Sequence, residues 1–173
     1  VSDSSTDKSP EIALREKCIL VKHDKVGYGY AYLEGVEHAK GKYLFLADAD
    51  MTYDFSEIPR FILELEKGAQ FVIGDRFGKP MQKDAMPFLH KYLGNPVLSK
   101  IFNIFFNSKI KDVHCGMRAI RKSDFDNLHL HTTGMEFASE MIVKAVKNKY
   151  SFTQIPISYK RRIGESKLNT WRD

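Results

Sequence analysis

Apolar runs and amphipathic stretches follow one another along this chain and predict strands and helices in alternation. Short apolar runs bounded by polar residues are typical of buried strands, and apolar positions three and four apart are typical of helices. We expect one strand to begin at Tyr43 and run into Asp48, and others near residues 17–22, 70–74, 114–120 and 152–159. Helices are expected near residues 8–16, 30–39, 56–67 and 135–147. This alternation predicts an α/β domain with a mostly parallel central sheet and helices on both faces.

The middle of the chain has a different pattern. Residues 77–87 are rich in Lys, Gly, Pro and Met, which predicts a mobile loop that is either a lid or a plain surface connection. Residues 88–107 carry dense apolar positions and are expected to form two helical pieces broken at Pro96. Core packing is the preferred interpretation of the second piece. The alternative is that Phe102, Phe105 and Phe106 help to form a lipid-facing surface or groove.

Candidate chemistry begins where the strand at residue 43 ends. Asp48 and Asp50 are separated by one alanine, so both carboxylates project the same way and can converge on one hard cation. Aspartates in such a place also cap the helix that follows a strand, and an Asp-x-Asp alone does not decide between these roles.

Ligands of open α/β sheets sit at the carboxyl ends of the strands. Asp3, Gly27, Asp48 and Arg76 all fall near such ends in the predicted order. Gly27 and Gly29 would let backbone N–H groups approach a phosphate or ribose, although two glycines are equally typical of a tight turn.

Five further segments accompany the two aspartates: residues 74–77 (GDRF), 112–118 (DVHCGMR), 134–140 (GMEFASE), 156–159 (PISY) and 162–168 (RIGESKL). In this order they resemble the family 2 glycosyltransferases, and among them the polyprenyl-phosphate enzymes such as dolichyl-phosphate mannose and glucose synthases. The resemblance runs from Ser5 to about Trp171, and residues 48–59 and 85–96 are more similar to the bacterial and archaeal glucose-type branch. It implies a GT-A-type, Rossmann-like fold.

The resemblance also implies how the chain is organised. Residues 1–173 are expected to form a single catalytic domain, one that lacks the amino-terminal strand and helix of its relatives and any carboxy-terminal membrane segment. Position 2 is Ser where relatives commonly carry an acidic residue. Whether position 2 contacts the nucleobase is therefore left open.

Composition narrows the picture only slightly. The chain has 173 residues, 43% hydrophobic and 28% charged, which is ordinary for a globular domain. A net charge of +5 fits an anionic partner without choosing among nucleotide-sugar, lipid phosphate, membrane surface and nucleic acid. Two distant cysteines indicate a reduced cytosolic setting, and no apolar run is long enough to span a bilayer, so the segment is expected to be soluble or peripheral.

The implied reaction moves a hexose from a nucleoside diphosphate sugar to a polyprenyl or dolichyl phosphate, with inversion, at the cytoplasmic face of a membrane. Mg²⁺ or Mn²⁺ on Asp48 and Asp50 would neutralise the departing diphosphate. A phosphate acceptor is mostly dianionic at neutral pH and requires no general base. The nucleotide-sugar is expected to contact Asp3, Gly27, Gly29, Asp48 and Arg76, and the acceptor phosphate Arg76, Lys91, Arg118, Arg162 and Lys167. For each cation, a solvated charge or a structural ion pair is the competing interpretation.

Asp112 and Glu136 are the remaining catalytic candidates, because relatives with hydroxyl acceptors carry a base at about this stage of the chain. Either residue would orient the acceptor or act as a base, and Glu136 is equally an acid at a helix amino terminus. A rival function is therefore transfer to a sugar or glycan hydroxyl. A second rival is a non-catalytic module that binds nucleotide or anionic lipid. Nucleic-acid binding is disfavoured, because the aromatic residues are spaced as core.

Overall fold

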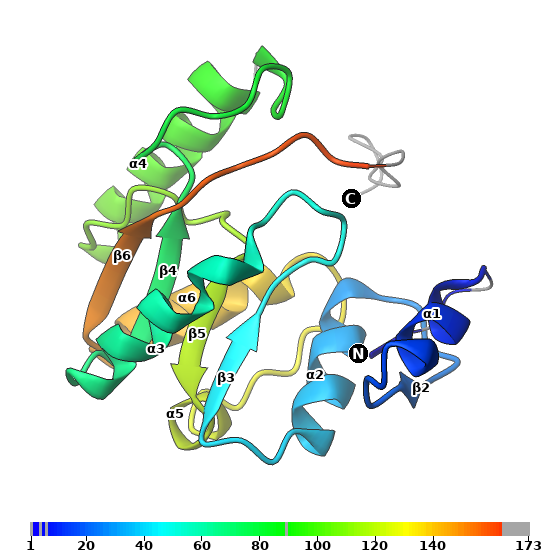
Figure 1. Ribbon diagram of the computed structural model, residues 1–173. Helices are drawn as coiled ribbons and strands as arrows, with labels where there is room; N and C mark the ends of the chain where they lie inside the picture. Colours follow the sequence, from blue (N-terminus) through cyan, green and yellow to red (C-terminus); the bar gives the residue numbers. More distant parts are fainter. Residues whose placement is uncertain (1, 4, 6, 89, 164–173) are drawn as a thin grey trace.

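A four-stranded sheet forms the centre of the computed structural model, which describes residues 2, 3, 5, 7–88 and 90–163 (Figure 1). Its strands are β3 (Tyr43–Leu46), β4 (Phe71–Asp75), β5 (Arg118–Arg121) and β6 (Phe152–Pro156), in the order β3-β5-β4-β6. β4 and β6 are parallel, and β5 runs antiparallel to both β3 and β4. Three of these four strands therefore share one direction, and the expected mostly parallel sheet contains one reversed strand.

Helices cover both faces of this sheet, as expected. α3 (Ile58–Glu66) lies in front of the sheet and α6 (Phe137–Lys147) behind it (Figure 1). All five residues of β4 are buried, which requires cover on both sides, and Phe61 of α3 and Met141 of α6 are fully buried in the same core. A short 3₁₀ turn, η1 (Phe55–Glu57), precedes α3, and Asp54 caps it by accepting a hydrogen bond from the Ser56 amide.

The amino-terminal part forms a separate small layer. β1 (Ser2–Asp3) and β2 (Val21–Lys22) pair in parallel, and α1 (Ser9–Arg15) connects them. α2 (Tyr28–His38) then leads to β3 and lies between this layer and the main sheet (Figure 1). The short helix α5 (Lys122–Asp126), which directly follows β5, was not anticipated from the sequence pattern.

The segment after the loop at residues 76–88 departs from its expected form. A π-helical turn, η2 (His90–Gly94), runs directly into α4 (Asn95–Phe106), and Pro96 stands in the first turn of α4 instead of breaking it. α4 lies at the β6 edge of the molecule (Figure 1). Ile104 and Phe105 are 71% and 79% exposed, so core packing accounts for only one face of this helix. No helix in the described part of the chain is both long and apolar enough to cross a membrane.

Candidate functional site

A polar pocket of about 520 Å³ lies where β3 and β4 end. This volume is within the range of small-molecule sites. Its walls come from the amino terminus of α2, the segments after β3 and β4, the turn before β5, the start of α6 and the chain after β6. The charged and phenolic groups that line it include Tyr28, Asp48, Arg76, Arg118, Glu136 and Arg162.

Asp48 is the carboxylate that faces this pocket from the end of β3. Its Oδ1 accepts a hydrogen bond of 3.2 Å from the Tyr32 hydroxyl, and a Cβ placed on Gly116 would come within 2.7 Å of its Oδ2. The glycine at position 116 therefore leaves room for the carboxylate. Burial first, and the charge of Asp50 second, raise the pKa of Asp48 above its ordinary value.

Asp50 lies beside the pocket and is held by two neighbours. Its Oδ1 accepts hydrogen bonds from the Thr52 amide (3.1 Å) and hydroxyl (2.6 Å). Its Oδ2 forms an ion pair of 2.7 Å with Arg162 Nε. Arg162 thus pairs with Asp50, while Asp48 faces the cavity.

The two carboxylates fit a divalent cation whose coordination is completed by a bound ligand. Both are hard oxygen donors, and their mutual repulsion, which contributes to the raised pKa of Asp48, is what a cation would relieve. Within the described residues, no group of three or more His, Cys, Asp and Glu side chains is placed to hold a metal. A cation on Asp48 and Asp50 would need its other ligands from a diphosphate and water, which suits Mg²⁺ or Mn²⁺.

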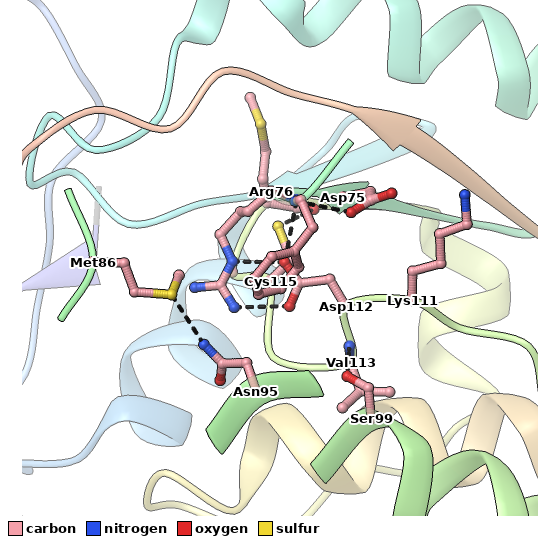
Figure 2. Close-up of polar contacts among 12 residues, drawn as sticks. Asp75, Arg76, Met86, Asn95, Ser99, Lys111, Asp112, Val113 and Cys115 are labelled. Atoms are coloured by element: carbon pink, nitrogen blue, oxygen red, sulfur yellow. Dashed lines mark hydrogen bonds and ion pairs between the residues drawn. The ribbon is translucent and has the colours of Figure 1, made fainter. Parts of the chain in front are cut away.

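Arg76 is bound to Asp112 in a buried, two-pronged ion pair. Nε of Arg76 donates to Oδ2 of Asp112 at 2.6 Å, Nη2 donates to Oδ1 at 2.7 Å, and the Arg76 amide adds a third hydrogen bond at 3.2 Å (Figure 2). The two residues are 7% and 1% exposed. Burial alone would lower the pKa of Arg76, but its bonds to Asp112 raise it overall. Asp112 therefore points at an arginine, and Arg76 borders the pocket with its charge already neutralised.

Arg118 is a buried cation of the pocket whose guanidinium is bound by backbone carbonyls, and its charge lowers the pKa of Asp48. It is 3% exposed, and its guanidinium donates to the carbonyls of Cys115 (2.8 Å), Ala138 (2.7 Å) and Val113 (3.2 Å). No ion pair of Arg118 is found in the described part of the chain. Because the buried guanidinium is bound to no carboxylate in the described residues, this wall of the pocket favours an anion.

Gly27 and Gly29 serve a close contact between α2 and the loop at residues 132–134. A Cβ on Gly27 would lie 2.4 Å from the Thr133 carbonyl oxygen, and one on Gly29 would lie 2.4 Å from that of Thr132. The Gly29 amide donates to the Gly134 carbonyl at 3.2 Å. The structure thus gives these glycines a packing role and directs the Gly29 amide to protein.

Glu136 and Glu140, one turn apart at the start of α6, have different surroundings. Glu136 is exposed and lines the pocket, and hydrogen bonds from the amides of Glu136, Gly134 and Thr133 lower its pKa. Burial alone would raise the pKa of Glu140, but hydrogen bonds from Lys144, Thr132 and the amide of His131 lower it to about 2. Glu140 therefore fixes the loop against which α2 packs, and that loop leads to Glu136.

Lys91, which was expected at the acceptor phosphate, is not brought to the pocket. Lys91 lines a separate cavity of about 230 Å³, where its ammonium lies 5.1 Å from the Tyr92 ring centroid. The backbone of Asp3 pairs with that of Lys22 in the separate β1–β2 sheet. Lys167 lies outside the described residues.

The pocket also contains residues that the sequence reasoning did not single out. The hydroxyl of Tyr28 donates to that of Tyr32, which donates to Asp48, and Tyr53 accepts a hydrogen bond from the Gly116 amide at 2.9 Å. Tyr159 stacks against Arg76, with 5.3 Å between its ring centroid and the guanidinium carbon. The spacing of Tyr28 and Tyr32, four residues apart on one helix face, was the available signal.

The loop at residues 77–87, expected to be either a lid or a plain connection, borders the pocket. Met86 lines it, and the Asn95 side-chain amide donates to the Met86 sulfur at 3.3 Å, which joins the loop to the start of α4 (Figure 2). The Gln82 amide donates to the Tyr159 carbonyl at 3.1 Å.

Comparison with known proteins gives a family and similar relatives. The profile of the family described as Glycosyl transferase family 2 matches residues 1–128. The chain is 40% identical, over its whole length, to the low-salt glycan biosynthesis hexosyltransferase Agl6 of Haloferax volcanii, and it spans 42% of that protein. It is 28% identical to the dolichyl-phosphate hexose transferase of the same organism, over 96% of this chain and 72% of the relative. The chain thus corresponds to only part of these relatives.

Solved structures show the same fold. The chain resembles glucosyl-3-phosphoglycerate synthase of Mycobacterium tuberculosis in complex with phosphoglyceric acid, with a TM-score of 0.73 at 14% identity, over 97% of this chain and 61% of that one. A structure of the same enzyme with Mn²⁺, UDP-glucose and glycerol 3-phosphate gives a TM-score of 0.70 at 14% identity, over 96% and 60%. At this identity the likeness establishes the expected GT-A-type fold.

Proposed function

This chain belongs to glycosyl transferase family 2, and we propose that it is the catalytic domain of an enzyme that moves a hexose from a nucleoside diphosphate sugar to a polyprenyl or dolichyl phosphate. The donor is of the UDP-glucose or GDP-mannose type, and residues 1–173 form one domain of a longer protein. The enzyme works at the cytoplasmic face of a membrane, through a peripheral contact of this domain. The names of the Haloferax relatives support the hexose and the lipid phosphate.

The observation that carries the proposal is the charge layout of the pocket. Asp48 stands on one wall, beside Asp50, and Arg118 stands buried on another without a carboxylate partner. The wall with Asp48 suits a cation bound to a diphosphate. The wall with Arg118 suits another anion. A donor diphosphate and an acceptor phosphate are two such anions in one site.

On the donor side, Asp48 and Asp50 would hold Mg²⁺ or Mn²⁺. When bound, the cation supplies electrostatic stabilisation of the charge that develops on the leaving diphosphate. Tyr32 keeps the Asp48 carboxylate oriented through its 3.2 Å hydrogen bond, and Gly116 keeps the space in front of the carboxylate open. Arg162 lies beside Asp50, where its guanidinium can stabilise the second negative charge of the diphosphate.

On the acceptor side, a phosphate monoester brings its own nucleophile. Its second pKa is about 6, so it is mostly dianionic at neutral pH and no side chain has to remove a proton. Arg118 would position it, because a guanidinium held by three carbonyls is fixed in orientation and keeps its full charge. Attack from the face opposite the departing diphosphate inverts the anomeric centre.

A second candidate function is transfer to a sugar hydroxyl, and the position of Glu136 favours it. Glu136 is an exposed carboxylate in the same pocket, where a general base would stand. Its lowered pKa argues against this role, because an effective base has a pKa near the working pH. We therefore prefer the phosphate acceptor.

The experiment supplies the full-length protein with Mn²⁺ or Mg²⁺, a polyprenyl phosphate and a panel of radiolabelled UDP- and GDP-sugars. We expect label from one donor to enter the organic phase, and we expect Asp48→Asn to reduce this transfer by at least about 100-fold. Glu136→Gln is the matched carboxylate control and is expected to keep the wild-type pH profile. Transfer to a soluble sugar alone, with loss of the acidic limb of the profile in Glu136→Gln, would establish the hydroxyl acceptor instead.

A further inference from the structure

A second cavity, apolar and about 210 Å³ in volume, lies between α4 and α6. α4 contributes Leu98, Ile101, Phe102 and Phe105, and α6 contributes Ile142. His114 carries the one titratable side chain among its lining residues. A sugar or nucleotide would leave its polar groups unpaired against such walls, which makes them suitable for a hydrocarbon.

This apolar groove adjoins the polar pocket. His114 and Ser139 line both cavities, so the two share a wall formed by the turn before β5 and the first turn of α6. Ser139 directly follows Ala138, whose carbonyl holds Arg118. A ligand with an anionic head at Arg118 therefore has an apolar channel immediately beside that head.

We propose that the groove between α4 and α6 binds the first isoprene units of the acceptor lipid while the lipid's phosphate lies at Arg118. The inference rests on the proposed function and adds to it the path of the hydrocarbon chain. This occupant is chosen because the groove is continuous with the pocket. A ligand that fills both must have an anionic group joined to a hydrocarbon chain. The exposed Phe105 side chain continues the apolar surface outward, as a chain that leaves the groove requires.

α4 offers a matched pair of variants for the test. Ile101 lines the groove, whereas Ile104, one turn further and 71% exposed, does not. Ile101→Glu places a charge in the hydrocarbon path, and Ile104→Glu places the same charge on the same helix outside it. Both variants are made in the full-length protein and checked for folding by thermal unfolding.

The readout is kcat/KM for farnesyl phosphate, which has three isoprene units, compared with ethyl phosphate, which is too short to enter the groove. Ile101→Glu is expected to reduce kcat/KM for farnesyl phosphate by roughly tenfold or more, with no change for ethyl phosphate. Ile104→Glu is expected to leave both values unchanged. Photolabelling with a farnesyl phosphate that carries a diazirine on its second isoprene unit should mark α4 and α6 in the wild type and lose this labelling in Ile101→Glu.

The outcomes separate the groove from the proposed function. If the wild-type protein uses farnesyl phosphate but Ile101→Glu keeps the wild-type preference over ethyl phosphate, the groove is wrong and the function stands. Equal losses in Ile101→Glu and Ile104→Glu would overturn the groove as well, because they would indicate a general surface effect. If no donor transfers label to any lipid phosphate and the photolabel misses α4 and α6, both proposals fail.

Discussion

Replacing Asp112 by asparagine tests whether this residue is structural or catalytic. Both of its carboxylate oxygens accept hydrogen bonds from the Arg76 guanidinium, at 2.6 and 2.7 Å, and both residues are buried. Asp112→Asn removes the negative charge and leaves a buried guanidinium facing an amide. Breaking a buried pair by removing one partner costs about 3–5 kcal/mol. For a chain of this size about 1 kcal/mol corresponds to ~2–4 °C, so we expect the melting temperature to fall by roughly 6–20 °C.

The assay is thermal unfolding followed by circular dichroism and calorimetry, with urea unfolding as a second measure. Asp126→Asn is the control, because Asp126 is an exposed carboxylate on α5 and its loss should leave stability within about 0.5 kcal/mol. The double variant Arg76→Met/Asp112→Leu removes both charges together. Since a buried pair replaced by apolar residues is often neutral, the double variant should recover most of the stability that Asp112→Asn loses.

Kinetics complete the test. Measured well below its melting temperature, Asp112→Asn should keep the shape of the wild-type pH profile, because the residue removes no proton in the reaction. A variant that is as stable as wild type, has only weak residual activity and has lost the acidic limb of its pH profile would refute the structural role. It would make Asp112 the base of a hydroxyl-transfer reaction.

Three further predictions concern the surroundings of the site. Tyr32→Phe removes the hydrogen bond to Asp48 and should weaken Mn²⁺ binding, measured by the paramagnetic resonance of free Mn²⁺, by about 10-fold; an unchanged affinity would show that Tyr32 does not orient the carboxylate. Glu140→Gln should remove a pH dependence of stability: because the pKa of Glu140 is lowered from 4.5 to about 2, wild type should lose about 2 kcal/mol relative to the variant as pH falls through this range, and parallel urea-unfolding curves would contradict this. Gly29→Ala places a methyl group 2.4 Å from the Thr132 carbonyl oxygen and should destabilise the domain by about 1–3 kcal/mol, whereas a variant as stable as wild type would show that the loop yields freely.

The fold was largely predictable from the sequence pattern, and the exceptions have physical causes. Apolar runs predicted β3 and β4, and β4 is buried on both faces, as such a run indicates. The direction of β5 was not visible, since a buried strand has the same apolar pattern whether it runs parallel or antiparallel to its neighbours. The five-residue helix α5 is too short to show a period.

The outer face of α4 shows another limit of pattern reading. A helix that is apolar nearly all round predicts burial, since most such helices are buried in their own protein. Here Phe102 packs against the core while Ile104 and Phe105 face outward. The same side-chain types therefore occupy both faces, and hydrophobicity alone does not separate core from binding surface.

The predicted ends of the strands identified two residues that line the pocket, but not the side chains with which they pair. Asp48 and Arg76 both reach the pocket, as the rule that ligands sit at the carboxyl ends of strands predicts. The pairing of Arg76 with Asp112 joins residues 36 positions apart and depends on how β4 and the turn before β5 meet. No spacing rule contains that information. The glycines at the start of α2 likewise have neighbours more than 100 positions away along the chain.

The three arginines of the pocket show why partners, and not motifs, decide a residue's role. Arg76, Arg118 and Arg162 were equivalent in the sequence, each a cation within a segment similar to the family. In the structure, Arg76 is paired with Asp112 and Arg162 with Asp50, while Arg118 is held by carbonyls and the Met141 sulfur. A bound phosphate gains most from the guanidinium that is not already paired with a carboxylate, because its desolvation has already occurred on folding. The electrostatic demand for an anion in this pocket is therefore concentrated at Arg118, the point beside which the apolar groove begins.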